Sequence, residues 1–314
     1  MGTKKIKPAI LAVYFLLYLA GGLYPADVNQ GNQAAQGAPD ITITGSINWE
    51  KGELNFTSAF SLGSAGLKFP SGRTQAEEIL GGNFADLVKP LLFSLQADSS
   101  STIGDLIQRG DIDYRALDEI CSTAKVTPPN FTADLTRFTG SYSIPLSRLG
   151  SVLLRHSLAA EPIRPIIPSP AANYTGIVII ADTLLPVHGR NTSLYLTPCI
   201  LPKIWDSEMN LIFEKNMLNP AAAGSGLNNI VQYTSSVNIY RSTPSGIDPE
   251  LAKLVGDHPL LIFADSVFGI IPTDPVIDKT DALLILSNDN NRRLLREGRI
   301  AFVINTGMLE KALP

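Results

Sequence analysis

Asn173-Tyr-Thr-Gly-Ile-Val-Ile-Ile-Ala-Asp182 and Leu260-Leu-Ile-Phe-Ala-Asp265 are two short apolar runs that both end in Ala-Asp. β-Branched residues crowd both runs and turn-forming residues bound them, which predicts two buried strands. The first run follows a proline-rich break between Glu161 and Pro170. Such a connector is stiff and extended, so it favours a boundary between two domains. A proline-rich loop inside a single domain is the alternative.

The residues before this break predict an N-terminal domain over positions 40–160. Alternating apolar residues on either side of Lys51-Gly52 predict a β-hairpin, Ile41–Leu62. A second alternating run, Leu135–Ile144, is expected to return to this hairpin as a strand. A final helix is expected from about Pro145.

Helices are expected between the hairpin and the returning strand. Apolar residues recur at helical spacing from Thr74, and a kink or break is expected at Gly81-Gly82 and at Pro90. Asp113 is a suitable N-cap for a later helix, which Pro128-Pro129 is expected to end.

The residues after the break predict a C-terminal domain over positions 173–314, separated from the first by a linker at 161–172. Leu194–Trp205 is broken by prolines and predicts an irregular or edge strand, with Met209–Phe213 as its hairpin partner. Asp248 is expected to cap a short helix. Together the elements predict an α+β fold of two domains, each a small mixed or antiparallel sheet with packed helices.

The N-terminus has the layout of a secretory signal peptide over residues 1–26. Lys4, Lys5 and Lys7 precede an apolar run, Pro8–Ala20, which is shorter than the ~20 residues of a spanning helix. An uncleaved membrane anchor is the alternative. Residues 27–39 are rich in Gln, Asn, Gly and Ala and predict a flexible leader. We therefore expect a periplasmic or cell-envelope protein that contacts the membrane only through the signal segment before cleavage.

Composition narrows the classes of partner. The 314 residues carry a formal net charge of −4, and no run of Lys and Arg follows the first few residues. This pattern gives no electrostatic footprint for nucleic acid. The two cysteines, Cys121 and Cys199, are expected to be separate buried thiols, although export would permit a disulfide.

The sequence contains no recognisable set of catalytic or cofactor-binding residues. His156, His188 and His258 lack metal-ligand spacing, and no Gly-x-Ser-x-Gly elbow or phosphate loop occurs. A serine triad assembled in space is a residual alternative. We therefore predict no enzyme, no cofactor and no metal.

Acidic residues are densest near the end of the chain. Asp265, Asp274, Asp278 and Asp281 could hold a hard cation through oxygen ligands, but the alternating spacing of a calcium loop is missing. Capping of turns and of a helix start by Asp274 and Asp278 is the favoured interpretation. The polar run Asn288–Arg293 is expected to be a solvated turn or helix surface, with a partner-binding patch as the alternative.

An ordered set of short motifs resembles a family of exported bacterial envelope proteins. This family includes small outer-membrane lipoproteins and proteins of the flagellar assembly protein T type. The motifs are Tyr174-Thr-Gly-Ile-Val-Ile, Pro202-Lys-Ile-Trp-Asp206, Val255-Gly-Asp-His-Pro-Leu260, Asp281-Ala282 and Gly298-Arg-Ile-Ala-Phe-Val303. A weaker resemblance covers residues 71–153. The chain lacks the lipidated cysteine of the lipoprotein members, so outer-membrane anchoring does not transfer.

These observations predict a non-enzymatic envelope protein that acts by protein–protein interaction. The resemblance implies envelope or flagellar proteins as partners and a role in envelope or flagellar assembly. An envelope-directed hydrolase and a small-ligand-binding periplasmic protein are the alternatives. The expected partner surface comprises Asp182, His188, Asp274, Arg292 and Arg293.

Overall fold

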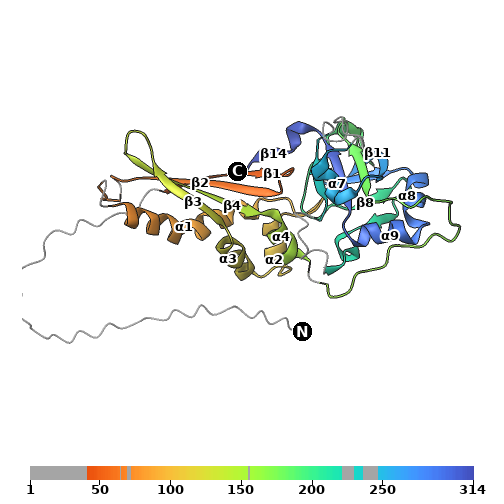
Figure 1. Cartoon of the computed structure of the whole chain (residues 1–314), viewed down its shortest axis with the longest axis horizontal. Coiled ribbons are helices and arrows are strands. Elements are labelled where there is room, and N and C mark those ends of the chain that lie inside the picture. The colour runs from red at the N-terminus through yellow and green to blue at the C-terminus, as the bar shows by residue number, and fades with distance from the viewer. Residues whose placement is uncertain (1–40, 64, 69–71, 155, 221–229, 236–246) are drawn as a thin grey trace, which may run out of the picture. The chain divides into compact units, whose positions relative to one another are not determined.

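The computed structural model describes residues 41–63, 65–68, 72–154, 156–220, 230–235 and 247–314 (Figure 1). The expected signal peptide and leader lie outside these residues. Within the described part of the chain, no helix is both long and apolar enough to cross a membrane.

The first sheet has five strands in the order β14-β1-β2-β4-β3. The predicted hairpin is confirmed, because β1 (Ile41–Asn48) pairs antiparallel with β2 (Glu53–Ser61) over all eight residues of β1. Gly52 has a φ of 66°, which suits a glycine at the turn between them. The predicted returning strand is also confirmed, since β4 (Arg137–Pro145) pairs with β2.

The edge strand β3 (Lys125–Phe131) differs from the prediction for Pro128-Pro129. These prolines do not merely end a helix, because they lie within a strand. β3 pairs with β4, and its register shifts between Thr127 and Asn130, on either side of the two prolines. Proline has no N–H to donate, so an irregular edge strand is a position that tolerates it.

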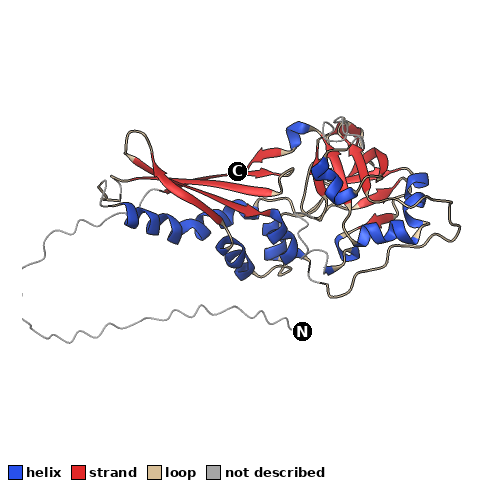
Figure 2. Ribbon diagram, viewed as in Figure 1, coloured by secondary structure: helices blue, strands red, loops and turns tan. Residues whose placement is uncertain are grey.

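Four helices cover one face of this sheet (Figure 2). They are α1 (Arg73–Phe93), α2 (Ile103–Gln108), α3 (Tyr114–Ser122) and α4 (Leu146–Leu153). The predicted cap is confirmed, since the Asp113 side chain accepts a hydrogen bond from the Arg115 N–H. α1 is continuous through Gly81-Gly82 and Pro90, where a break was one expectation. Buried Leu80, Phe84 and Val88 hold this helix against the core, and such packing overrides local propensity.

The second sheet has seven strands in the order β10-β13-β5-β11-β12-β8-β9. At its centre, β5 (Ile177–Ala181) runs parallel to both β11 (Leu260–Phe268) and β13 (Ile300–Ile304). All five residues of β5 are buried, which confirms the predicted core strand. A Cβ at Gly176 would lie 2.5 Å from the Val255 backbone, so only glycine permits this approach.

The remaining strands make the sheet mixed. They are β12 (Asp274–Ile277), β8 (Ile204–Asp206), β9 (Leu211–Phe213) and β10 (Gln232–Thr234). β12 is antiparallel to β11 and β9 is antiparallel to β8, whereas β8 and β12 are parallel. The small hairpin β6 (Leu185–Pro186) and β7 (Ser193–Leu194) lies beside β11. The α+β class with two sheets and packed helices is therefore as predicted.

Helices cover the second sheet unevenly. α7 (Pro249–Val255) packs on one face against alternate residues of β5 and β13. α8 (Lys279–Leu286) and α9 (Asp289–Arg296) contribute to the core on the opposite face. The described residues also form two short 3-10 helices, η1 (Lys215–Met217) and η2 (Thr306–Met308).

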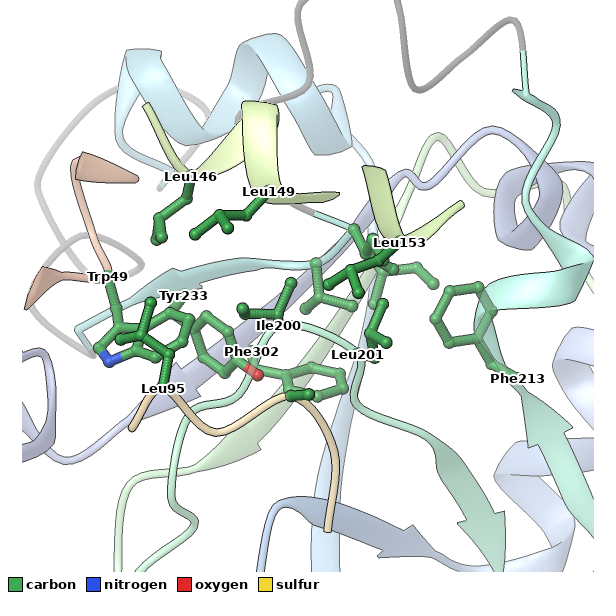
Figure 3. Close-up of a cluster of buried hydrophobic side chains, with 14 of the residues drawn as sticks. Trp49, Leu95, Leu146, Leu149, Leu153, Ile200, Leu201, Phe213, Tyr233 and Phe302 are labelled. Atoms are coloured by element: carbon green, nitrogen blue, oxygen red, sulfur yellow. The ribbon is translucent and has the colours of Figure 1, made fainter. Parts of the chain in front are cut away.

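The two sheets share a hydrophobic core (Figure 3). The Trp49 ring meets the Tyr233 ring edge-on at 5.4 Å between centroids. The Ile200 and Leu201 N–H groups donate to the Gln96 and Ala97 carbonyl oxygens at 3.2 and 2.7 Å. The described part of the chain therefore behaves as one compact unit, although its two sheets are distinct.

The last strand crosses from the predicted C-terminal domain into the first sheet. β14 (Glu310–Ala312) pairs antiparallel with Ser46–Asn48 at the end of β1. The predicted linker at 161–172 lies between most strands of the first sheet and those of the second. β14 is the exception, because it follows the second sheet in sequence but belongs to the first sheet.

The connector between the sheets is held by asparagine side chains at the start of α9. The Asn291 Nδ2 donates to the Ala172 carbonyl at 2.9 Å and to the Leu284 carbonyl at 3.0 Å, while its Oδ1 accepts from the Tyr174 N–H at 3.1 Å. The Asn290 Nδ2 donates to the Tyr174 carbonyl at 2.9 Å. We call this arrangement the asparagine clamp; it corrects the expectation that Asn288–Arg293 is simply a solvated surface.

The buried member of this clamp should be important for stability. Asn291 is 1% exposed, and Asn291→Ala would leave two carbonyls and one N–H without these partners. We expect the free energy of unfolding to fall by about 2–3 kcal/mol in urea denaturation. Asn83→Ala is the control, because Asn83 is exposed and its side chain donates to the Ile79 carbonyl within the same helix at 2.7 Å, and this change should alter stability by about 0.5 kcal/mol or less. Equal losses in both variants would contradict a role for the clamp.

Candidate functional site: an aromatic row beside a buried carboxylate

Asp274, at the start of β12, is a buried carboxylate held by hydrogen bonds. The residue is 1% exposed. Its Oδ1 accepts from the Thr273 Oγ1 at 2.8 Å and from the Lys203 N–H at 3.2 Å, and its Oδ2 accepts from the Trp205 Nε1 at 3.4 Å. Burial raises the pKa of Asp274, and the hydrogen bonds oppose this shift without cancelling it. The carboxylate therefore fixes both the main chain before β8 and the indole on β8.

The indole that Asp274 binds is one of three rings in mutual contact, which we call the aromatic row: His188, Phe268 and Trp205. Phe268 ends β11 and meets the Trp205 ring at 5.7 Å and the His188 ring at 6.1 Å, both edge-on. Edge-to-face contacts of this kind are favourable because ring edges are positive and ring faces negative. His188 is exposed and the other two rings are half-buried, so the row is accessible to a partner.

Two cations lie beside the row. The Lys203 Nζ lies 5.9 Å from the centroid of the Trp205 ring. The Arg190 Nη1 donates to the Ile270 carbonyl at 3.2 Å. Among the described residues neither cation forms an ion pair, whereas nearby Lys279 pairs with Glu208 at 2.7 Å. Lys203 and Arg190 thus retain charge that a ligand could neutralise.

An apolar stripe runs along the same strand. Leu261 and Phe263 alternate with buried residues on β11 and are 47% and 66% exposed, and Ile270 at the β11–β12 turn is 68% exposed. In register, Leu261 lies beside Val178 and Phe263 beside Ile180, the two β5 residues that α7 covers. The cover by α7 therefore stops before β11. The apolar stripe (Leu261, Phe263, Ile270) corrects the expectation that Leu260–Asp265 is a buried strand, because only alternate residues of it are buried.

The structure places the expected partner residues in three different environments. His188 and Asp274 belong to the same region, joined through Phe268 and Trp205. Asp274 is nevertheless buried, so it cannot itself form part of an exposed partner surface. Its predicted role in capping a turn is also not the role observed, because it binds the Trp205 indole and the Lys203 N–H.

Arg292 and Arg293 lie on α9 and belong to the neighbourhood of the asparagine clamp. Arg292 is 6% exposed, and its guanidinium contacts the Leu286 carbonyl and the Asp289 carboxylate. It is therefore not a surface residue, which corrects the prediction. Arg293 is exposed, but it donates to the Asn290 Oδ1 at 2.8 Å.

Asp182 follows β5 and stands apart from both groups. Its side chain is half-buried, and its carbonyl accepts from the Asn305 Nδ2 at 3.5 Å. Asp278 does cap α8 as predicted, because its side chain accepts from the Thr280 N–H at 2.7 Å.

The nucleophiles and bases of the described chain are scattered. Cys121 and Cys199 are free and buried, as predicted, and burial raises the pKa of Cys121 to about 11. His156 contacts the Leu218 carbonyl at 2.6 Å, and His258 stacks on Tyr174. In the residues that the structure describes, no three His, Cys, Asp or Glu side chains gather as metal ligands.

Phe268, Trp205, Lys203 and Arg190 were missed as site residues by reasoning from sequence. Lys203 and Trp205 lie in one of the motifs that carry the family resemblance, which was the available signal. The link to Phe268 and Arg190 depends on the pairing of β8, β12 and β11, which no local pattern specifies.

Asp274 and Asp278 should affect stability with opposite pH dependence. The pKa of Asp274 is raised in the folded protein, so the unfolding free energy that it contributes falls as pH rises above the ordinary carboxyl pKa of about 3.9. The pKa of Asp278 is lowered by its hydrogen bonds to Thr280, so its contribution rises over acidic pH and persists at pH 7. Urea unfolding at several pH values from about 4 to 7 gives the free energy of unfolding of each protein. The free energy of the wild type minus that of Asp274→Asn should decrease as pH rises. The free energy of unfolding of the wild type minus that of Asp278→Asn should increase over the same range. If both differences changed in the same direction with pH, the opposite pKa shifts of the two carboxylates would be refuted.

Two parts of the chain are similar to domains of a known family. No curated protein matches the chain. Residues 40–152 match a family model described as Treponema pallidum Tp0624, N-terminal domain, and residues 176–306 match one described as Treponema pallidum Tp0624, second domain. These two matches occur in the order of the named domains and together cover more than half of the chain. The chain therefore resembles Tp0624 over both of these domains.

Proposed function

We propose that this is a non-enzymatic, exported cell-envelope protein that acts by protein–protein interaction, with the apolar stripe as its contact surface. Export rests on the signal layout of residues 1–26, and a role in envelope or flagellar assembly rests on the resemblance of the motifs. The partners in this proposal are envelope or flagellar proteins. The single observation that carries the interaction is the exposure of Leu261 and Phe263 on an ordered strand.

The exposure of these side chains is unfavourable for the protein alone. Burying a Phe or Leu side chain is worth about 1.5–3 kcal/mol, so a partner that covered both would gain from their removal from water. Aromatic side chains are enriched in the energetically dominant centres of interfaces. The half-buried rings of the aromatic row border the same strand and extend this surface.

The position of the apolar stripe also favours a recognition role. Leu261 and Phe263 lie on the part of β11 that pairs with β5, and the following part of the strand, Ala264–Phe268, pairs with β12. The strand is therefore hydrogen-bonded along its length, and its side chains are presented in fixed alternation at Leu261 and Phe263. A rigid apolar surface binds with a smaller loss of conformational entropy than a mobile loop.

Site-specific cross-linking tests this function. A photoreactive phenylalanine analogue in place of Phe263, in cells that make the protein, should give a discrete cross-linked product with another envelope protein. The same analogue in place of Val126, which is 62% exposed on β3, is the matched control and should give little product. Adding Leu261→Asp should reduce the product from position 263, because a buried carboxylate opposes binding.

Other outcomes would favour another class. Equal products from positions 126 and 263, or none from either, would contradict the proposed contact surface. Turnover of an envelope substrate by the purified protein would favour a hydrolase, and a ligand-dependent rise in Tm without any cross-link would favour a small-ligand binder.

A further inference from the structure

We infer that the aromatic row and its two flanking cations bind an acidic, apolar-containing segment of the protein partner. The carboxylates of that segment would face Lys203 and Arg190, and its apolar side chains would cover Trp205, Phe268 and the apolar stripe. This inference rests on the proposed function, because it names the chemistry of the partner at that surface.

The charge of this surface is the first argument. The whole chain has a formal net charge of −4, yet Lys203 lies over the Trp205 ring and Arg190 donates to the adjoining turn, whereas Asp274, the carboxylate that also contacts the row, is buried. In the described chain the exposed cations Lys253 and Lys279 have carboxylate partners within 2.7 Å. Lys203 and Arg190 form no such ion pair among the described residues. An acidic partner would supply the missing charge.

The buried Asp274 carboxylate interacts electrostatically with Lys203, but the two form no ion pair. Its oxygens accept from the Thr273 hydroxyl, the Lys203 main-chain N–H and the Trp205 indole. The Lys203 ammonium lies instead over the Trp205 ring. A cation over an indole face is weakly held where water has access, so it can also meet an incoming carboxylate.

The apolar groups distinguish an acidic protein segment from a purely hydrophilic anion. Phe263 and Ile270 are 66% and 68% exposed, and they lie on the strand and turn that also carry Phe268. A sulfated or carboxylated polysaccharide would satisfy the cations and leave these side chains in water. A segment with both acidic and aliphatic residues would satisfy both features at once.

Fluorescence anisotropy with defined peptides tests this inference on the wild-type protein. The probe is a fluorescein-labelled peptide of repeating Glu-Glu-Leu-Leu units, and its comparator contains Lys in place of Glu. We expect the Glu peptide to bind at least tenfold more tightly at low ionic strength, with a loss of affinity as salt is added. Lys203→Gln combined with Arg190→Gln should weaken binding about fivefold or more.

Matched variants separate local from general charge effects. Arg115→Gln combined with Lys125→Gln removes two exposed cations from α3 and β3, which also lack ion pairs among the described residues, and binding should be unchanged. Phe263→Ser tests the apolar contribution and should weaken binding of the Glu peptide about fivefold or more. Circular dichroism verifies that each variant is folded.

Three results would overturn the inference. These are equal binding of the Glu and Lys peptides, equal loss in the two double variants, and full displacement of the Glu peptide by dextran sulfate with no effect of Phe263→Ser. The last result would assign the surface to anionic glycans. If the Glu peptide does not bind but cross-linking from position 263 gives a discrete product, the inference about the partner's charge is wrong and the proposed interaction function stands.

Discussion

The central strand β5 must be covered on both faces, and the rest of the second sheet depends on how this is achieved. Ile177, Ile179 and Ala181 face the core that the two sheets share, and Val178 and Ile180 face α7. A parallel strand buried on both faces is typical of sheets with layers on either side. Here the first sheet's own core completes one layer, so neither half of the chain buries its apolar surface independently.

The second layer is narrow, and its narrowness creates the exposed surface. α7 extends only from Pro249 to Val255, and it is brought close to the sheet where Gly176 has no side chain. This short helix reaches β5 and β13 but leaves the outer side of β11 uncovered. The apolar stripe is thus a consequence of the same packing that buries β5. A longer helix or a second helix on this face would have covered it.

Elements specified by neighbouring residues could be predicted, and those specified by distant ones could not. The hairpin around Lys51-Gly52, the cap at Asp113 and the apolar core of β5 depend on local pattern. The edge position of Pro128-Pro129 and the exposed side of β11 depend on which strands pair, so composition alone could not assign them. Leu260–Asp265 illustrates the limit, since an apolar run does not state whether both of its faces find a partner.

Polar residues were the hardest to place for the same reason. Asn291 looks like a surface amide in sequence, but its side chain replaces the hydrogen bonds that an extended connector cannot make with itself. Asn288 and Asn290 also donate to main-chain carbonyls of this segment, at Ala171 and Tyr174. A run of asparagines beside a proline-rich segment has a physical reason once the two are seen together, because proline removes N–H donors and leaves carbonyls to be satisfied.

Asp274 is the clearest departure from what stability alone would favour. Its neighbours on β12, Val276 and Ile277, are apolar and buried, and an apolar residue at position 274 would avoid the desolvation that raises the carboxyl pKa. Such a residue could not accept the Trp205 indole N–H or the Lys203 main-chain N–H. Both donors would then need other partners, and the indole would lose its fixed orientation beside Phe268. The buried carboxylate is therefore best understood as a positioning group, which holds the half-buried Trp205 indole in its orientation beside Phe268.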